Sequence, residues 1–186
     1  IWQTPYTSAE SIFSMPMTTT NNPGTQNGLT HYYNPLSSES FYLVTAEGSA
    51  YALMDATDVR KTMLVISGSR YFLNKWPDYT TRTDYAPVMR YAEVLLNLSE
   101  AIVREGNAVT QRAVDLLNAV RTRSFATGGY TLASFATVQD FYNAILLERN
   151  IEFLGEGLRN MDLMRLSLPI PGKNGGGMGN VAAIPT

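Results

Sequence analysis

The sequence has no cysteine, which excludes disulfides, thiolate nucleophiles and thiolate zinc sites. It has a single histidine, His31, so a Ser-His-Asp triad would have to use that residue, and no Gly-x-Ser-x-Gly turn accompanies it. A lone histidine in a tyrosine-rich stretch is more often a surface hydrogen-bonding residue. No apolar run reaches the roughly 20 residues that a membrane-spanning helix needs. These absences leave few routes to covalent or metal-assisted catalysis.

An excess of basic residues is also missing. The chain carries 14 Lys and Arg against 16 Asp and Glu, for a net charge of −2, and its pI is near 5.4. Such a chain has no surplus of cations to neutralise a phosphate backbone, so nucleic acid is not an expected partner. The 186 residues, 45% of them hydrophobic, suffice for one globular domain. Because the sequence starts at Ile1 without a methionine, we expect it to be a piece of a longer protein.

The first part of the chain, residues 1–83, is rich in Thr, Ser, Asn, Pro, Gly and Tyr, and predicts loops with short strands. Residues 11–17 alternate with a period of two, as a half-buried strand does, and Pro16 indicates that the strand lies at a sheet edge or ends there. Residues 62–66 and 70–73 flank a Ser-Gly-Ser link and predict a hairpin.

The second part, residues 84–166, changes to a helical period. We expect a first helix with Pro87 in its first turn and Gly106 at its end, then an antiparallel helix over 110–124. The second helix should bury Ala113, Val114, Leu117 and Val120 against a stripe of the first. That stripe consists of Val88, Tyr91, Ala92, Leu95, Leu98, Ser99 and Ile102.

Two further helices and a tail complete the pattern. Thr137 and Asp140 have the spacing of a capping box and should start a third helix. A short amphipathic helix is expected over 158–166, and residues 167–186 form a Gly- and Pro-rich loop. The predicted fold is mainly α, a tetratricopeptide-type helical scaffold joined to a loop-rich part with short β-strands.

Acidic and basic residues alternate at helical spacing near the third helix. Paired carboxylates could serve a hydrolase or a metal, but Arg neighbours would keep the acids ionised, and no histidine completes a metal shell. We therefore favour a partly buried ion-pair network that holds structure and binds nothing. Its expected members are Glu148, Arg149, Glu152, Glu156, Arg159 and Asp162.

Aromatic residues in the polar part of the chain point to sugar binding. Sugars place their apolar C–H faces on aromatic rings and bond their hydroxyls to amides in nearby loops. The alternative is that these rings fill small cores beneath long loops. Tyr32 and Tyr33, which directly follow a long polar loop, are the more favoured candidates. The expected ligand-binding residues are Asn27, His31, Tyr32, Tyr33 and Trp76, with no catalytic or metal-binding residue.

Several segments, in order, resemble the SusD/RagB family. Residues 84–101, with Arg-Tyr-Ala-Glu-Val-Leu-Leu-Asn, resemble one family helix, and residues 117–123, Leu-Asn-Ala-Val-Arg-Thr-Arg, resemble another. Residues 145–165 resemble the family's block of Glu-Arg, Glu-Gly-x-Arg and Asp-Leu-x-Arg. Residues 12–15 resemble the strand that precedes the family's glycan-binding loops.

This resemblance implies a function that composition alone does not. Members of the family are non-enzymatic lipoproteins of the outer membrane that capture glycans and sit over a SusC-type TonB-dependent transporter. The resemblance implies no cofactor. It implies that the only membrane contact is a lipid anchor located upstream of this segment. Two alternatives stay open: a helical scaffold or relative that binds proteins or peptides, and a hydrolase that uses the acidic cluster.

Overall fold

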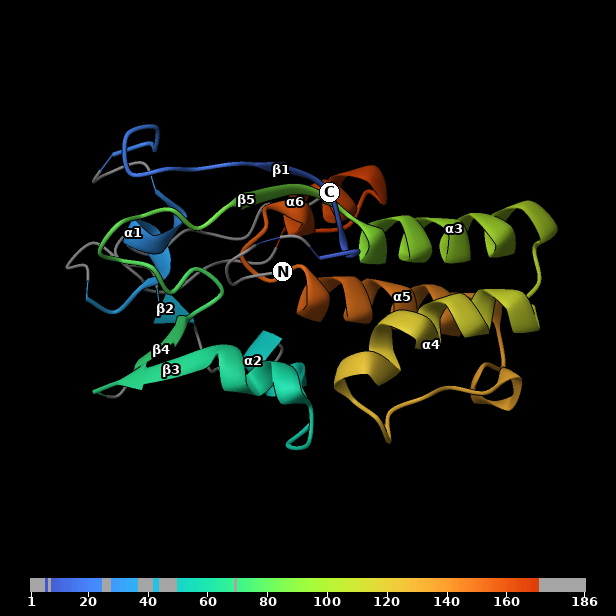
Figure 1. The fold of residues 1–186 in the computed structure, drawn as a ribbon. Helices are drawn as coiled ribbons and strands as arrows, with labels where there is room; N and C mark the ends of the chain where they lie inside the picture. Colours follow the sequence, from blue (N-terminus) through green and yellow to red (C-terminus); the bar gives the residue numbers. More distant parts are fainter. Residues whose placement is uncertain are drawn as a thin grey trace.

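A computed structural model describes residue 6 and residues 8–24, 28–36, 42–43, 50–68 and 70–170 (Figure 1). Short strands and helices lie at one end of the molecule, and three long helices lie side by side at the other. The elements are β1 (Ser11–Met15), α1 (Leu29–Tyr33), β2 (Tyr42–Leu43), α2 (Ala50–Leu53), the 3-10 helix η1 (Val59–Met63), β3 (Leu64–Ser67), β4 (Arg70–Leu73), β5 (Ala86–Arg90), α3 (Tyr91–Gly106), α4 (Gln111–Ser124), the 3-10 helix η2 (Leu132–Ser134), α5 (Val138–Glu152) and α6 (Leu158–Arg165).

The strands form two small antiparallel sheets. One has the order β2-β4-β3, and its β3–β4 hairpin turns at Gly68, whose φ of +60° suits glycine. The other pairs β1 with β5, which directly precedes α3. The predicted hairpin is confirmed, and so is the end of the first strand before Pro16. No helix in the described ranges is long and apolar enough to cross a membrane.

The three long helices bury the main hydrophobic core. Asn107, in the left-handed conformation, ends α3, and Thr110 then caps α4 by accepting a hydrogen bond from the backbone N–H of Ala113. The capping box of Thr137 and Asp140 starts α5, as predicted. The core is almost fully shielded from solvent. Its fully buried members include Leu96, Val103, Leu117, Val120, Phe141 and Ile145.

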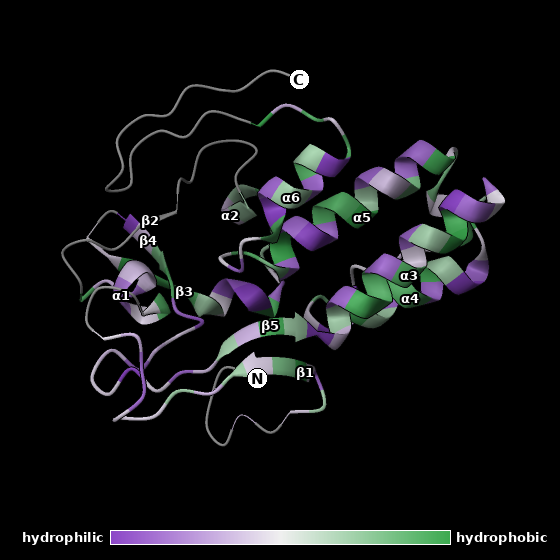
Figure 2. Ribbon diagram, turned by 90° about the horizontal axis from the view of Figure 1, so that it is seen from above, coloured by the Kyte–Doolittle hydropathy of each residue, from purple (hydrophilic) through white to green (hydrophobic). Residues whose placement is uncertain are grey.

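The start of the first long helix and part of its buried stripe were predicted wrongly. Residues 86–90 form β5, so Pro87 lies in a strand opposite Ser14 and the helix begins only at Tyr91. Val88, Tyr91 and Leu98 are 52%, 51% and 43% exposed. Figure 2 shows β5, paired with β1, leading directly into α3, with hydrophobic residues along β5 and α3.

The buried face of α3 matches the predicted stripe only in part. Ala92 and Ser99 of the predicted stripe are buried, together with Leu96 and Val103, whereas Leu95 and Ile102 only pack at the edge of the core. The Ser99 hydroxyl donates a hydrogen bond to the Ala113 carbonyl at 2.7 Å, which requires close approach of the two helices. Small residues permit this approach. The buried face is rotated relative to the prediction, because Leu96 and Val103 are buried whereas Tyr91 and Leu98 are exposed.

We expect Leu96→Ala to lower the free energy of unfolding by about 2–5 kcal/mol, because it leaves a cavity in a fully buried position. Leu98→Ala, two residues along the same helix, should cost less than about 0.5 kcal/mol. Urea unfolding monitored by circular dichroism measures both. Equal losses for the two variants would contradict the assignment of the buried face.

Candidate functional site

Two glutamates one turn apart on α5 form the centre of a buried ion-pair network. Glu148 is fully buried, and its carboxylate accepts from Arg60 Nη1 at 2.6 Å and from Arg121 Nη1 at 2.8 Å. Glu152, 4% exposed, accepts from Arg60 at 3.0 Å, Arg90 at 2.9 Å and Arg123 at 2.5 Å. These arginines come from η1, the end of β5 and α4, so the network joins distant parts of the chain.

The network continues beyond the end of α5. Glu156 binds Lys75 Nζ at 2.6 Å and Arg90 Nε at 2.8 Å, and Lys75 also donates to the Glu152 carbonyl at 2.8 Å. Arg90 reaches Glu10 at 2.6 Å on its other side. Lys75 and Arg90 are 5% and 3% exposed. Buried cations and carboxylates therefore compensate each other across elements far apart in the sequence.

A second cluster links α5, α6 and α3. Arg149 Nε donates to Asp162 at 2.7 Å, and Arg165 contacts both Asp162 at 3.0 Å and Glu100 at 2.8 Å. The predicted network is thus confirmed for five of its expected members. Arg159 was predicted wrongly, because its side chain makes no ion pair or hydrogen bond with any residue that the structure describes. The confirmed members are Glu148, Arg149, Glu152, Glu156 and Asp162.

The surrounding cations keep Glu152 ionised. Burial by itself would raise the pKa of Glu152, but the charges of Arg90, Arg123 and Lys75 outweigh it and hold the pKa at about 2. Burial lowers the pKa of Lys75, and the neighbouring Glu156 carboxylate opposes this effect. A carboxyl group with so low a pKa cannot donate a proton near neutral pH, so it is unsuited to act as a general acid.

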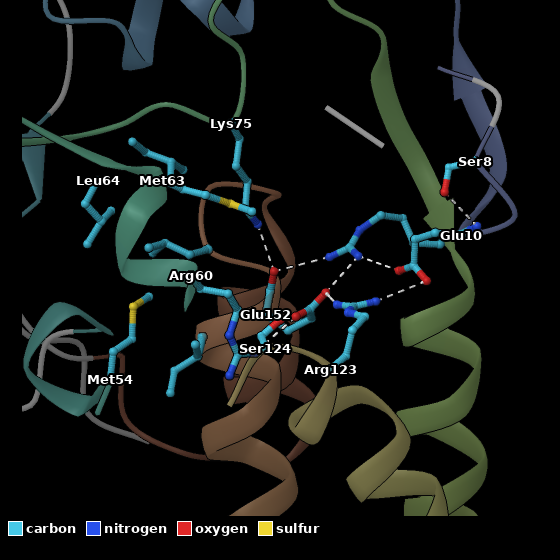
Figure 3. A pocket seen from close by; sticks show the side chains of 14 residues that line it. Ser8, Glu10, Met54, Arg60, Met63, Leu64, Lys75, Arg123, Ser124 and Glu152 are labelled. Atoms are coloured by element: carbon cyan, nitrogen blue, oxygen red, sulfur yellow. Dashed lines mark hydrogen bonds and ion pairs between the residues drawn. The ribbon is translucent and has the colours of Figure 1, made fainter. Parts of the chain in front are cut away.

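The network borders a cavity of about 300 Å³ (Figure 3). Figure 3 shows Glu10, Arg123 and Glu152 gathered on one side of it, with Met54, Met63 and Leu64 on the other. The charged groups of the wall bind one another. Among the described residues, no cluster of His, Asp or Glu side chains has the geometry of a metal site. This cavity therefore has apolar surface and paired charges, but no free carboxylate pair.

The aromatic residues predicted to bind ligand lie on or beneath α1. The rings of His31 and Tyr32 are partly exposed and meet edge to face, with centroids 5.3 Å apart. Tyr33 stacks on Trp76 with centroids 5.1 Å apart, and its hydroxyl donates to the Gly155 carbonyl at 3.1 Å. Trp76 is 1% exposed, so it supports Tyr33 from within the core and does not present a ring face to solvent. Asn27 lies outside the described residues.

A second hollow of about 300 Å³ opens beside the start of α1. Thr30, Arg82 and Asp84 line it, together with apolar side chains. Asp84 accepts hydrogen bonds from the Tyr6 hydroxyl and from the Asp78 backbone N–H, both at 2.7 Å. Burial, followed by the hydrogen bond to Asp84, raises the pKa of Tyr6 well above its usual value.

Sequence reasoning did not single out Arg82 or Asp84. They lie in a loop that Asp78 organises by accepting hydrogen bonds from the backbone N–H groups of Thr81, at 2.8 Å, and Thr83, at 2.9 Å. The Asp-x-x-Thr spacing that produces such turns is visible in the sequence and could have indicated a rigid loop. This loop and α1 line the same hollow although they lie some 50 residues apart in the chain, and local spacing could not indicate this.

Comparison with known proteins places the chain in a family. A model of the SusD family matches residues 51–175. A SusD superfamily protein from Bacteroides fragilis is 32% identical with a TM-score of 0.77, and the match covers 97% of this chain and 41% of that one. A SusD superfamily protein from Bacteroides vulgatus is 24% identical with a TM-score of 0.73, over 95% of this chain and 41% of the other.

A third similar structure is surface glycan-binding protein A from Bacteroides uniformis. It is 26% identical with a TM-score of 0.58, over 89% of this chain and 39% of that protein. A search of curated proteins found no match. The chain spans about two fifths of the length of these solved relatives. The family match over most of the sequence and the close structural agreement show that the chain belongs to the SusD family.

Proposed function

We propose that the protein captures glycans at a bacterial cell surface and delivers them to a SusC-type TonB-dependent transporter of the outer membrane. Membership of the SusD family carries this proposal, and a relative named surface glycan-binding protein A supports it. In this proposal a lipid anchor outside the present segment holds the protein on the membrane. Because the solved relatives are longer, other parts of the protein would complete the binding site.

We place the part of the glycan site that this chain supplies on α1 and the loop before it. His31 and Tyr32 offer partly exposed rings, and Tyr33 is held in place by its stacking on Trp76 and its hydrogen bond to Gly155. A ring that is already fixed loses little conformational entropy when a sugar stacks on it. Asn27 would add an amide for the sugar hydroxyls.

The paired acids favour binding without catalysis. A glycosidase needs one carboxyl group whose pKa is raised so that it can protonate the leaving oxygen. Glu148 and Glu152 are instead buried against arginines, and the pKa of Glu152 is lowered to about 2. We therefore assign these glutamates a structural role: they hold the loop-rich part of the chain against the long helices.

Glycan binding by α1 is tested with the mature full-length protein. A glycan array identifies a bound sugar, and calorimetry then compares the wild type with Tyr32→Ala. We expect binding in the micromolar to millimolar range, about 4–8 kcal/mol, and a loss of at least about tenfold in Tyr32→Ala through lost stacking. Tyr91→Ala on α3, also a partly exposed tyrosine, is the matched control and should bind as the wild type does. Equal affinities in all three proteins would remove α1 from the site.

The structural role of Glu152 predicts how stability depends on pH. Its folded-state pKa of about 2 lies below the value of about 4.3 expected in the unfolded chain. The stabilisation is therefore complete above about pH 5 and is lost as the pH falls through 4 towards 2. Lowering the pKa of Glu152 by about two on folding corresponds to about 3 kcal/mol in the free energy of unfolding. Thermal unfolding between pH 7 and pH 3 measures the effect.

Glu152→Gln should lower stability at pH 7 by about 3–5 kcal/mol, because it leaves buried arginines without a counter-charge. It should also flatten the pH dependence below pH 5. Glu105→Gln, at an exposed position of α3, is the matched control and should change neither quantity. If Glu152→Gln were as stable as the wild type, or if the wild type hydrolysed its glycan and the variant did not, the structural assignment would be wrong.

A further inference from the structure

One partly buried guanidinium group differs from the buried arginines of the ion-pair network. Arg60, Arg90, Arg121 and Arg149 each have at least one carboxylate partner within 3 Å. Arg159, near the start of α6, has none: within the described part of the chain its Nη1 atom is buried and without a hydrogen-bond acceptor. A buried guanidinium N–H without an acceptor is unfavourable, so this position favours an anion that can accept its hydrogen bond.

The side chain lines a cavity whose walls suit such an anion. The cavity measures about 350 Å³, at the lower end of the roughly 300–1,000 Å³ that small-molecule sites span. None of its lining residues is acidic. Burial lowers the pKa of Arg159, and the one carboxylate that opposes this, Asp162, already binds Arg149 and Arg165. The lining residues are Tyr33, Leu73, Asn150, Phe153, Leu154, Gly155, Gly157, Arg159, Asn160 and Leu163.

We propose that this cavity binds the negatively charged group of an acidic sugar, a carboxylate or a sulfate. A guanidinium group can donate two parallel hydrogen bonds to either anion. The amides of Asn150 and Asn160 can bond to the hydroxyls of the same sugar, and Phe153 and Leu154 supply apolar wall for its C–H face. The inference rests on the proposed glycan function and specifies the substrate class.

The cavity shares one lining residue, Tyr33, with the expected glycan site. This residue belongs to α1 and also lines the cavity, where its hydroxyl bonds to the Gly155 carbonyl. A glycan lying on α1 could therefore insert one charged residue next to Arg159. The hollow beside the start of α1 fits an anion less well. Arg82 there also has a buried Nε without an acceptor among the described residues, but it shares the hollow with Asp84.

Three sugars that share the same ring and differ only at carbon 6 test the proposal on the full-length protein. They are glucuronate, glucose 6-sulfate and glucose. Saturation-transfer NMR detects weak binding of each. We expect at least one charged sugar to bind about tenfold or more tightly than glucose, as a charge-assisted hydrogen bond allows. The better of the two charged sugars then tells whether carboxylate or sulfate is preferred. Equal binding of all three would overturn the proposal.

Arg159→Gln should abolish the preference for the charged sugar, whereas Arg112→Gln, at an exposed position of α4, should retain it. Because Arg159 makes no ion pair among the described residues, its substitution should not lower the melting temperature. A large fall in melting temperature would show that another part of the full protein supplies its counter-charge, which would also overturn the proposal. Retention of the preference in Arg159→Gln would do the same.

A glycan array on the same proteins separates this proposal from the proposed function. Binding of acidic glycans that is lost in Arg159→Gln supports both. Binding of neutral glycans alone, unchanged in Arg159→Gln, supports glycan capture and contradicts the anion site. If no glycan binds but glucuronate or glucose 6-sulfate still requires Arg159, the anion site stands and glycan capture fails.

Discussion

The fold depends on the burial of two glutamates on one face of α5. A carboxylate removed from water must be compensated by cations, and Glu148 and Glu152 receive them from segments that are far apart in the sequence. Each contributing arginine therefore fixes the position of its own segment against α5. The cations come from η1, the end of β5 and α4, namely Arg60, Arg90, Arg121 and Arg123. A loop-rich part with little core of its own is held on the helices in this way.

The same network positions the proposed binding surface. Lys75 bonds to the Glu152 carbonyl and to Glu156, which fixes the chain immediately before Trp76. Trp76 in turn supports Tyr33 on α1, and the Tyr33 hydroxyl binds the turn that follows α5. The α1 surface thus rests on a rigid base, and the cavity of Arg159 lies where α1, α5 and α6 meet. Binding residues on a short helix gain precision from the scaffold beneath them.

The sequence predicted the helices and turns well where the local pattern was unambiguous. The capping box at Thr137, the helix pair joined near Asn107 and the β3–β4 hairpin all depend on neighbouring residues. The buried face of α3 was less predictable, because Ala92 and Ser99 allow close helix packing while larger apolar residues such as Leu98 stay exposed. An apolar stripe alone does not tell which of two apolar faces a helix buries.

Long-range contacts limited the prediction of the site. The acids of the network were identified from their helical spacing, but their partners Arg60 and Arg90 lie about 90 and 60 residues away in the chain. For the same reason, the burial of Trp76 and the absence of a partner for Arg159 in the described residues could not be inferred from local sequence. The family resemblance supplied the fold, whereas the packing of individual side chains required the structure.

Hydrogen exchange of the Arg60→Gln variant tests most directly whether the buried network holds the loop-rich part on the helices. The account predicts that amide protection falls in β3, β4 and α1, while the core of α3 and α4, which does not depend on Arg60, keeps its protection. Unchanged protection in β3 and β4, or an equal loss throughout the chain, would contradict it.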